Sequence, residues 1–329
     1  MHSTTSQMST RDRIGAILRV TSGNFLEQFD FFLFGFYATY IAHTFFPASS
    51  EFASLMMTFA VFGAGFLMRP IGAIVLGAYI DKVGRRKGLI VTLSIMATGT
   101  FLIVLIPSYQ TIGLWAPLLV LIGRLLQGFS AGAELGGVSV YLAEIATPGR
   151  KGFYTSWQSG SQQVAIMVAA AMGFALNAVL EQSAISDWGW RIPFLMAGPL
   201  GLIVHFIRTK LADSPVYASM TEALDDKQQF ASTTKSVSPL RELFQNHFKT
   251  LVISFGACVL NAVGFYTVLT YLPTYLSDTV GMAAAQSSTI TTICLVLYVA
   301  LVFGMGHISD MFGRKKVLIG ACVAFIVLT

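Results

Sequence analysis

Long apolar stretches alternate with short polar ones along most of the chain. A helix needs roughly 20 mostly apolar residues to cross the hydrocarbon core of a bilayer. Eight stretches reach that length, and a ninth begins near Val317 but is too short. The eight lie near residues 17–46, 52–80, 88–107, 115–142, 153–180, 190–208, 248–276 and 284–306. The pattern therefore predicts an all-α integral membrane protein.

A polar segment separates six of these spans from the rest. Residues 209–247 contain Ser214-Pro215, a mixed charge run and several serines and threonines, which is typical of a linker, and we expect part of it to be helical. We predict four parts: an N-terminal tail (1–16), a six-helix bundle (17–208), the linker (209–247) and the start of a second bundle (248–329).

The composition and motifs of the chain argue against several other classes of protein. Of the 329 residues, 54% are hydrophobic and 11% are charged, whereas a soluble globular chain usually carries about 25% charged residues. The cysteines, Cys258, Cys294 and Cys322, lie in apolar runs without histidine partners, so we expect neither a disulfide nor a metal site. The sequence has no nucleophile–base pairing and no phosphate-binding loop. We therefore expect neither an enzyme nor a cofactor.

The basic residues predict the orientation in the membrane. Of the 21 lysines and arginines, 18 lie near the N-terminus or in alternate loops. The other loops, residues 47–51, 107–114, 181–189 and 277–283, contain none. The positive-inside rule places the N-terminus and the 209–247 segment in the cytoplasm. The net charge of +5 thus indicates membrane orientation, and we expect no nucleic-acid partner.

Two predicted loops on that side share one pattern. The first reads Gly77-Ala-Tyr-Ile-Asp81-Lys-Val-Gly84-Arg85-Arg86-Lys87, and the second, 229 residues later, reads Gly306-His-Ile-Ser-Asp310-Met-Phe-Gly313-Arg314-Lys315-Lys316. Internal duplication of a helical bundle is typical of secondary transporters. The pair resembles the loop 2–3 and loop 8–9 motif of the major facilitator superfamily, in which acidic and basic residues act as a gate. A lone basic loop would favour a simple membrane anchor over a gate, but the repeated frame reverses that preference.

Ionisable residues inside predicted spans are costly and usually functional. Glu27 and Asp30 lie three residues apart in the first span and face the same way. Arg124 lies in the fourth span, and Glu134 is ten residues further along it. We expect Arg124 to pair with a carboxylate of the first span.

Such a pair allows two functions. In one, the carboxylate stays ionised while arginine is close and takes up a proton when the two separate. In the other, a static ion pair fixes two helices. Because three acids share the bundle, the pattern favours proton coupling by Glu27, Asp30, Arg124 and Glu134.

Amides and a tyrosine supply candidates for the substrate site. Gln158 and Gln162 lie one turn apart in the fifth span, where they would line a cavity or bind two helices together. The other candidates are Asn24, Gln28, Gln127, Asn261 and Tyr266.

Three segments carry a family resemblance: residues 23–30, residues 69–73 and residues 124–132. Together they resemble the metabolite:proton symporter family of the major facilitator superfamily. Up to about Pro193 the chain is most similar to citrate and tricarballylate proton symporters. Residues 212–217 and 270–277 look more like the proline/betaine branch.

The resemblance implies a major facilitator fold of two bundles and twelve spans, with the second bundle incomplete in this chain. It implies proton symport of a small carboxylated metabolite, citrate or tricarballylate, across the inner membrane, by a monomer. The alternative is a proton symporter for proline, betaine or another zwitterionic osmolyte. We expect no transport by the 329 residues alone, because half of a second bundle cannot complete an alternating-access cycle.

Overall fold

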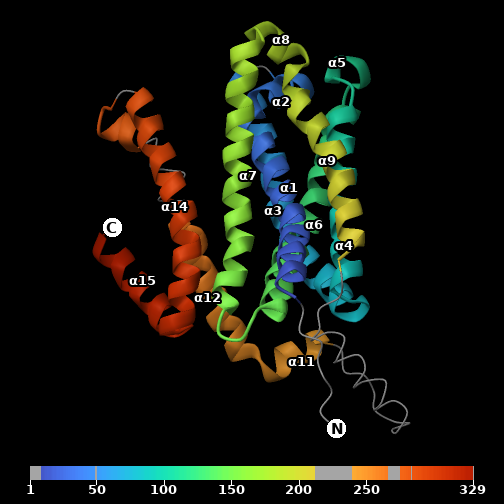
Figure 1. Cartoon of the computed structure of the whole chain (residues 1–329). Coiled ribbons are helices and arrows are strands. Elements are labelled where there is room, and N and C mark those ends of the chain that lie inside the picture. The colour runs from blue at the N-terminus through green and yellow to red at the C-terminus, as the bar shows by residue number, and fades with distance from the viewer. Residues whose placement is uncertain (1–8, 49, 212–238, 266–274, 283, 329) are drawn as a thin grey trace, which may run out of the picture. The chain divides into compact units, whose positions relative to one another are not determined.

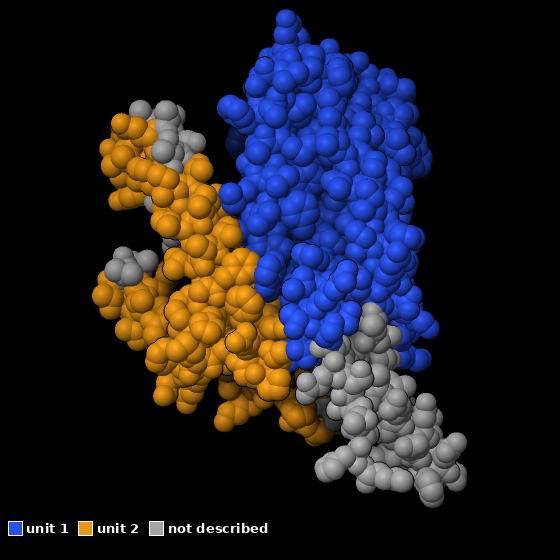
Figure 2. All heavy atoms as spheres, viewed as in Figure 1, with its two compact units in different colours: residues 1–146, 157–226 blue, residues 147–156, 227–329 orange. Residues whose placement is uncertain are grey.

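The computed structural model describes residues 9–48, 50–211, 239–265, 275–282 and 284–328. Every regular element in these ranges is helical, as predicted. The chain divides into two compact units (Figure 2): unit 1 contains residues 1–146 and 157–226, and unit 2 contains residues 147–156 and 227–329.

Unit 1 holds the helices that form the candidate site (Figure 1). In chain order they are α1 (Thr10–Phe36), α2 (Ala38–Phe45), α3 (Glu51–Val83), α4 (Arg85–Leu105), α5 (Tyr109–Ile112), α6 (Trp115–Ile145), most of α7 (Lys151–Val179), α8 (Gln182–Asp187), a 3-10 turn (Gly189–Arg191) and α9 (Ile192–Thr209). Unit 2 holds the first turn of α7 together with α11 (Pro239–Asn246), α12 (Phe248–Phe265), a π-helical turn (Tyr275–Thr279), α14 (Ala284–Phe312) and α15 (Arg314–Leu328).

Seven helical segments of the described chain are long and apolar enough to cross a membrane. They are Glu51–Val83, Arg85–Leu105, Trp115–Ile145, Lys151–Val179, Gly189–Thr209, Phe248–Phe265 and Thr292–Phe312, and they correspond to predicted spans two to eight. The first predicted span corresponds to α1 and α2, and α1 is less apolar because polar side chains, Glu27 and Asp30 among them, lie along it.

Three local features differ from the sequence prediction. Helix α1 begins at Thr10 rather than near residue 17, because the side chain of Ser9 caps it by accepting from the backbone N–H of Asp12 at 3.2 Å. The first span also breaks at Tyr37, where α2 begins. Two predicted loops contain the short helices α5 and α8.

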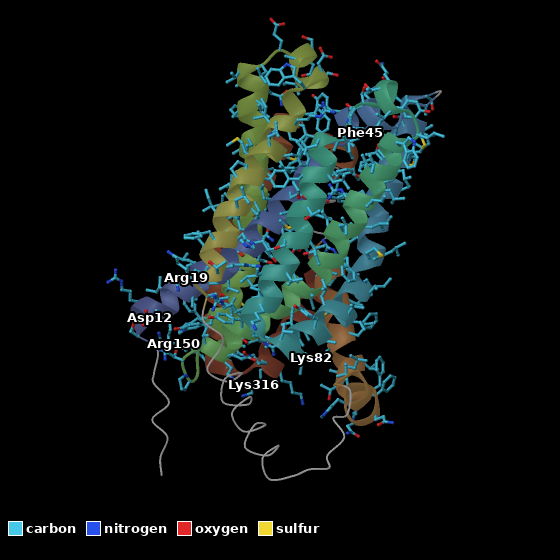
Figure 3. All side chains as sticks on the ribbon, turned by 90° about the vertical axis from the view of Figure 1, so that its right-hand side faces the viewer. Asp12, Arg19, Phe45, Lys82, Arg150 and Lys316 are labelled. Carbon is cyan, nitrogen blue, oxygen red and sulfur yellow. The ribbon has the colours of Figure 1, made fainter. Side chains whose placement is uncertain are left out.

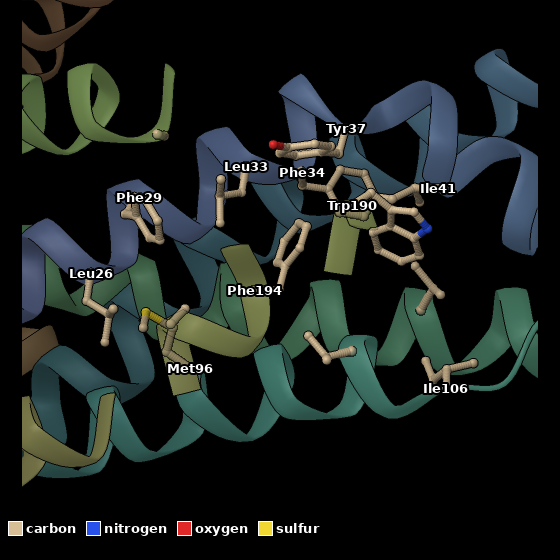
Figure 4. Close-up of a cluster of buried hydrophobic side chains, with 14 of the residues drawn as sticks. Leu26, Phe29, Leu33, Phe34, Tyr37, Ile41, Met96, Ile106, Trp190 and Phe194 are labelled. Atoms are coloured by element: carbon tan, nitrogen blue, oxygen red, sulfur yellow. The ribbon is translucent and has the colours of Figure 1, made fainter. Parts of the chain in front are cut away.

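The apolar core of unit 1 lies against one face of α1. Leu26, Phe29 and Leu33 follow one another along that face, and they pack near Met96 of α4 and Phe194 of α9 (Figure 4). The spacing of three and four residues is that of a helical stripe. This stripe holds α1 against the other helices, so that the polar side chains between its apolar positions enter the interior of the unit.

Helices α3 and α6 approach each other through glycine. A Cβ atom on Gly72 would overlap the carbonyl oxygen of Phe129, and one on Gly128 would overlap that of Gly65. Small residues at helix interfaces let two backbones come into direct contact in membrane proteins. The backbones of α3 and α6 therefore touch along the part of the unit that carries Arg124.

The two ends of unit 1 differ in character. Asp12, Arg19 and Lys82 lie near one end of the unit and Phe45 lies near the other (Figure 3). The ends of α3 and α9 and the start of α1 thus lie at the same end of the unit, which carries Asp12 and Lys82.

Candidate functional site

A chain of hydrogen bonds links three buried polar side chains inside unit 1. Nη1 of Arg124 on α6 donates to Oε1 of Gln127 at 2.7 Å, and Nε2 of Gln127 donates to Oδ2 of Asp30 on α1 at 2.6 Å. Nε2 also donates to Oγ1 of Thr100 on α4 at 3.0 Å. Asp30 and Arg124 are each 2% exposed. The structure therefore shows no direct pairing of Arg124 with a carboxylate of the first span: the amide of Gln127 lies between the two charges.

A small cavity of about 20 Å³, enough for about one water molecule, lies beside this network. Its polar lining consists of Glu27 and Asp30 from α1, Arg69 from α3, and Arg124 and Gln127 from α6. Ligand pockets are usually about 300–1,000 Å³ in volume. The cavity is much smaller than that in this structure, but two carboxyl and two guanidinium groups line it.

Neither guanidinium group in the cavity forms a salt bridge within the described chain. Instead, Arg124 lies 3.5 Å from the ring centre of Phe34, and Arg69 lies 4.8 Å and 4.7 Å from the rings of Phe31 and Phe66. Nε and Nη2 of Arg124 have no hydrogen-bond partner among the described residues. Aromatic faces stabilise a cation without using its N–H groups, so these donors remain available for an anion.

Glu27 is the second acid of the cavity. It is 8% exposed, and its Oε2 has no hydrogen-bond partner among the described residues. It lies three residues before Asp30, on the same face of α1, as the sequence predicted. Its part in proton coupling stays a prediction.

The fourth predicted coupling residue, Glu134, lies in a different contact. Both of its oxygens accept from Arg208 of α9: Oε1 from Nη2 in a short contact, and Oε2 from Nη1 at 3.2 Å. Oε2 also accepts from Oγ1 of Thr92 at 2.6 Å. Glu134 is 2% exposed and Arg208 is fully buried. The role of Glu134 in coupling stays a prediction, and its partner is Arg208 rather than Arg124.

Backbone carbonyls complete the surroundings of Arg208. Nη1 donates to the oxygen of Leu89 at 2.8 Å and Nη2 to that of Val20 at 2.9 Å. The guanidinium passes directly over Gly23 of α1, where a Cβ atom would overlap it. Arg208 therefore joins α1, α4, α6 and α9 at one point.

An amide cluster connects α1 with α7. Nδ2 of Asn24 donates to the backbone oxygen of Gln158 at 2.9 Å and to Oγ of Ser161 at 2.8 Å, while Nε2 of Gln162 lies 3.4 Å from Oδ1 of Asn24. Gln28 is absent from the lining of the cavity. The amides of Asn24, Gln158 and Gln162 thus contact one another, and their contact with a substrate stays a prediction.

The first gate motif forms a small ionic cluster in unit 1. Arg85 forms a salt bridge with Asp81 and lies 3.4 Å from Glu144 of α6. Arg86 donates to the backbone oxygen of Thr209. Gly84 separates α3 from α4 with a φ of +100°, which favours glycine.

The second motif forms a cap on α7 within unit 2. The carboxylate of Asp310 accepts from the backbone N–H groups of Gly152 and Phe153, each at 2.8 Å, and forms a salt bridge with Arg314. The first N–H groups of a helix have no partner within the helix and attract negative charge. Gly306 lies close to the backbone of Gly152. The gate function of both motifs, including Gly77 and Gly313, stays a prediction.

Two predicted substrate residues belong to unit 2. Tyr266 lies outside the described residues, and Asn261 belongs to α12, although its side chain lies outside them.

Comparisons with known proteins agree with this architecture. Residues 16–329 match the family model described as sugar (and other) transporter. The chain belongs to the sugar (and other) transporter family. Its members are transporters and not enzymes, and the chain is accordingly a multi-pass membrane protein.

Two relatives and one solved structure show which members of the sugar (and other) transporter family the chain is similar to. The chain is 68% identical to a citrate-proton symporter of Klebsiella pneumoniae, over 93% of this chain and 67% of the relative. It is 54% identical to a citrate-proton symporter of Salmonella typhi, over 99% of this chain and 72% of the relative. The structure is similar to that of the proton:xylose symporter XylE bound to 6-bromo-6-deoxy-D-glucose, with a TM-score of 0.72 and 16% identity, over 94% of this chain and 71% of that chain. The predicted major facilitator fold is confirmed.

Sequence reasoning missed Arg208, which it counted among the loop charges at the end of the sixth span. The residue in fact lies in the last turn of α9, in the apolar interior of this transporter. The position of Arg208 along the chain does not indicate whether its side chain points into the bundle or toward a loop. The one available signal was the buried Glu134, which needed a cation other than Arg124.

Proposed function

We propose that the chain is a proton-coupled symporter for a small carboxylated metabolite, citrate or tricarballylate. It lies in the inner membrane with its N-terminus in the cytoplasm, and it acts as a monomer. The excess of lysine and arginine in alternate loops supports this orientation.

One observation carries the proposal: the cavity combines two guanidinium groups that form no salt bridge within the described chain with two buried acids. A di- or tricarboxylate supplies the anions that Arg69 and Arg124 lack, because guanidinium binds carboxylate through paired hydrogen bonds. Relatives named citrate-proton symporters at 68% and 54% identity support the same solute class.

The acids supply the coupling. A buried carboxylate near an arginine stays ionised, and it takes up a proton when the arginine turns to another anion. When citrate binds to Arg124, the acid that Arg124 had stabilised, Asp30 or its neighbour Glu27, gains a proton. The proton and the substrate then cross together, and both leave on the side where the proton concentration is lower.

Labelled citrate uptake into vesicles that contain the complete transporter tests this function. An inward proton gradient should drive accumulation, and collapse of the gradient should abolish it. Asp30→Asn should abolish accumulation while citrate–citrate exchange continues, because exchange needs no net proton movement. Asp187→Asn, in the exposed helix α8, is the matched control and should behave as wild type.

Two outcomes would contradict the proposal. Accumulation that persists without a proton gradient would exclude proton coupling. Uptake of betaine that rises with osmolarity, without any uptake of citrate, would favour the osmolyte alternative that the proline/betaine resemblance implies.

A further inference from the structure

The amide of Gln127 has only one orientation that serves both of its neighbours. A guanidinium group has donors and no acceptor, whereas an ionised carboxylate has acceptors and no donor. Oε1 must therefore face Arg124, and Nε2 must face Asp30, as the contacts at 2.7 Å and 2.6 Å show. The orientation of this amide thus corresponds to the ionised form of Asp30.

Protonation of Asp30 makes this orientation of the Gln127 amide unfavourable. A proton on Oδ2 would point at the N–H of Gln127, so that two donors face each other. A proton on Oδ1 would have no acceptor, because Oδ1 has no hydrogen-bond partner among the described residues. A half-turn of the amide places Oε1 toward the acid and resolves the conflict. The same half-turn places the NH₂ group of Gln127 toward Nη1 of Arg124, and that hydrogen bond is lost.

We infer that Gln127 is an amide switch, in which protonation of Asp30 reverses the amide and frees Arg124 to bind a substrate carboxylate. The inference rests on the proposed function and assigns to Gln127 a positioning role in place of direct substrate contact. Once freed, Arg124 offers Nη1 in addition to Nε and Nη2, which already have no partner among the described residues. A carboxylate that bridges two of these N–H groups restores the lost hydrogen bonding.

The other charged groups around Asp30 do not connect it to Arg124 as the amide of Gln127 does. Glu27 comes from the same helix, Arg69 from α3, and both line the cavity. Glu134 from α6 and Arg208 from α9 bind each other. Helix α4 contributes the neutral Thr100. Of the described side chains, Gln127 is the one that contacts Asp30 and Arg124 together.

Two substitutions at this position should act in opposite directions. Gln127→Met keeps the size but accepts nothing from Arg124, so Arg124 is free at every pH. Gln127→Glu introduces a carboxylate that shares one proton with Asp30 and still accepts from Arg124, so Arg124 is held at every pH. Gln163→Met on α7 is the matched control, because Gln163 is also buried and lies outside the cavity lining.

The measurement is the dissociation constant of citrate for the purified complete transporter between pH 5.5 and 8. The ratio of each variant to wild type cancels the ionisation of citrate itself. Relative to wild type, Gln127→Met should bind about tenfold more tightly at the alkaline end and equally at the acid end, since a hydrogen bond to a charged group is at stake. Gln127→Glu should bind about tenfold more weakly at the acid end. Gln163→Met should give a ratio that does not change with pH.

Thr100→Val keeps the experiment decisive if a substitution at Gln127 prevents folding. This nearly isosteric change removes one of the two acceptors of Nε2, so the amide should reverse more easily and the ratio should shift about threefold in the direction of Gln127→Met. A ratio that is raised equally at every pH would show that Gln127 only touches substrate. A ratio that stays flat at one would show that it only joins helices. Either result overturns the switch, whereas citrate accumulation by the wild type that persists without a proton gradient would overturn the proposed function instead.

Discussion

Unit 1 contains two buried arginine–acid clusters, and they differ in how the charges meet. Arg208 and Glu134 contact each other directly, with Thr92 and two backbone carbonyls around them. Arg124 reaches Asp30 only through Gln127. All four charged residues are at most 2% exposed. Burial is therefore the same in the two clusters, and the bonding pattern is what differs between them.

The two patterns have different consequences for motion. Backbone carbonyls cannot leave Arg208 unless a helix moves, so the Arg208 cluster holds four helices in place. The acceptor of Arg124 is a side-chain amide, which can turn without any movement of the backbone. A static ion pair and a proton switch are the two interpretations that the sequence allowed for a single pair. We propose the static ion pair for the Arg208 cluster and the proton switch for the Arg124 cluster.

The largest expected loss of stability comes from substitution of Arg208. Arg208→Met should lower the free energy of unfolding by about 3–5 kcal/mol, because it leaves Glu134 charged, buried and unpaired. Thermal unfolding in detergent measures the change, and Arg11→Met at the exposed start of α1 is the control. The double variant with Glu134→Met should be more stable than the single one. Equal stability of the single variant and the control would show that this pair does not hold the unit together.

A smaller loss is expected at the helix face beneath this arginine. Gly23→Ala should lower the free energy of unfolding by about 1–3 kcal/mol, because the new methyl group overlaps the guanidinium of Arg208. Gly35→Ala lies on the same helix, where nothing is within 4 Å of the added atom. That control should be neutral or slightly stabilising, since alanine favours a helix more than glycine does. Equal losses at both positions would disprove the close contact.

Two of the threonines of α4, Thr92 and Thr100, test the two clusters separately. Thr92→Val removes a donor to Glu134 and should cost about 1 kcal/mol of unfolding free energy. Its effect on citrate affinity should be the same at every pH, in contrast to the pH-dependent effect of Thr100→Val. If Thr92→Val also changed the pH profile, the Arg208 cluster would take part in coupling, as the sequence predicted for Glu134.

The smallest change in stability is expected from a substitution at the surface. Asp81→Asn removes the salt bridge to Arg85, but the Asp81 side chain is 51% exposed and Glu144 remains close to Arg85. Exposed ion pairs contribute about 1 kcal/mol or less. Unfolding should therefore change little even if transport falls, which would identify the first motif as a gate. A loss as large as that of Arg208→Met would make the motif a structural element instead.

Much of the helical arrangement of unit 1 could be predicted from the sequence. The pairing of its buried arginines with acids could not. Apolar runs located the spans, and helical spacing placed Glu27 and Asp30 on one face. The cap at Ser9 was also readable, because a serine three residues before Asp12 is a helix-start signal. The partner of each arginine depends on how far one helix is shifted along another, and no local pattern records that shift. For the same reason the position of the Gln127 amide between two charges could not be predicted, and its predicted contact with substrate stays a prediction.

The glycine contacts between α3 and α6 have a consequence for selectivity. The cavity receives Arg69 from one of these helices and Arg124 from the other, and Gly132 packs against the backbone of Arg69 itself. Because the two backbones touch, neither helix can slide to suit a longer or shorter solute. The transporter should therefore discriminate among anions of equal charge by the separation of their carboxylates, so that adding or removing one methylene between them weakens binding.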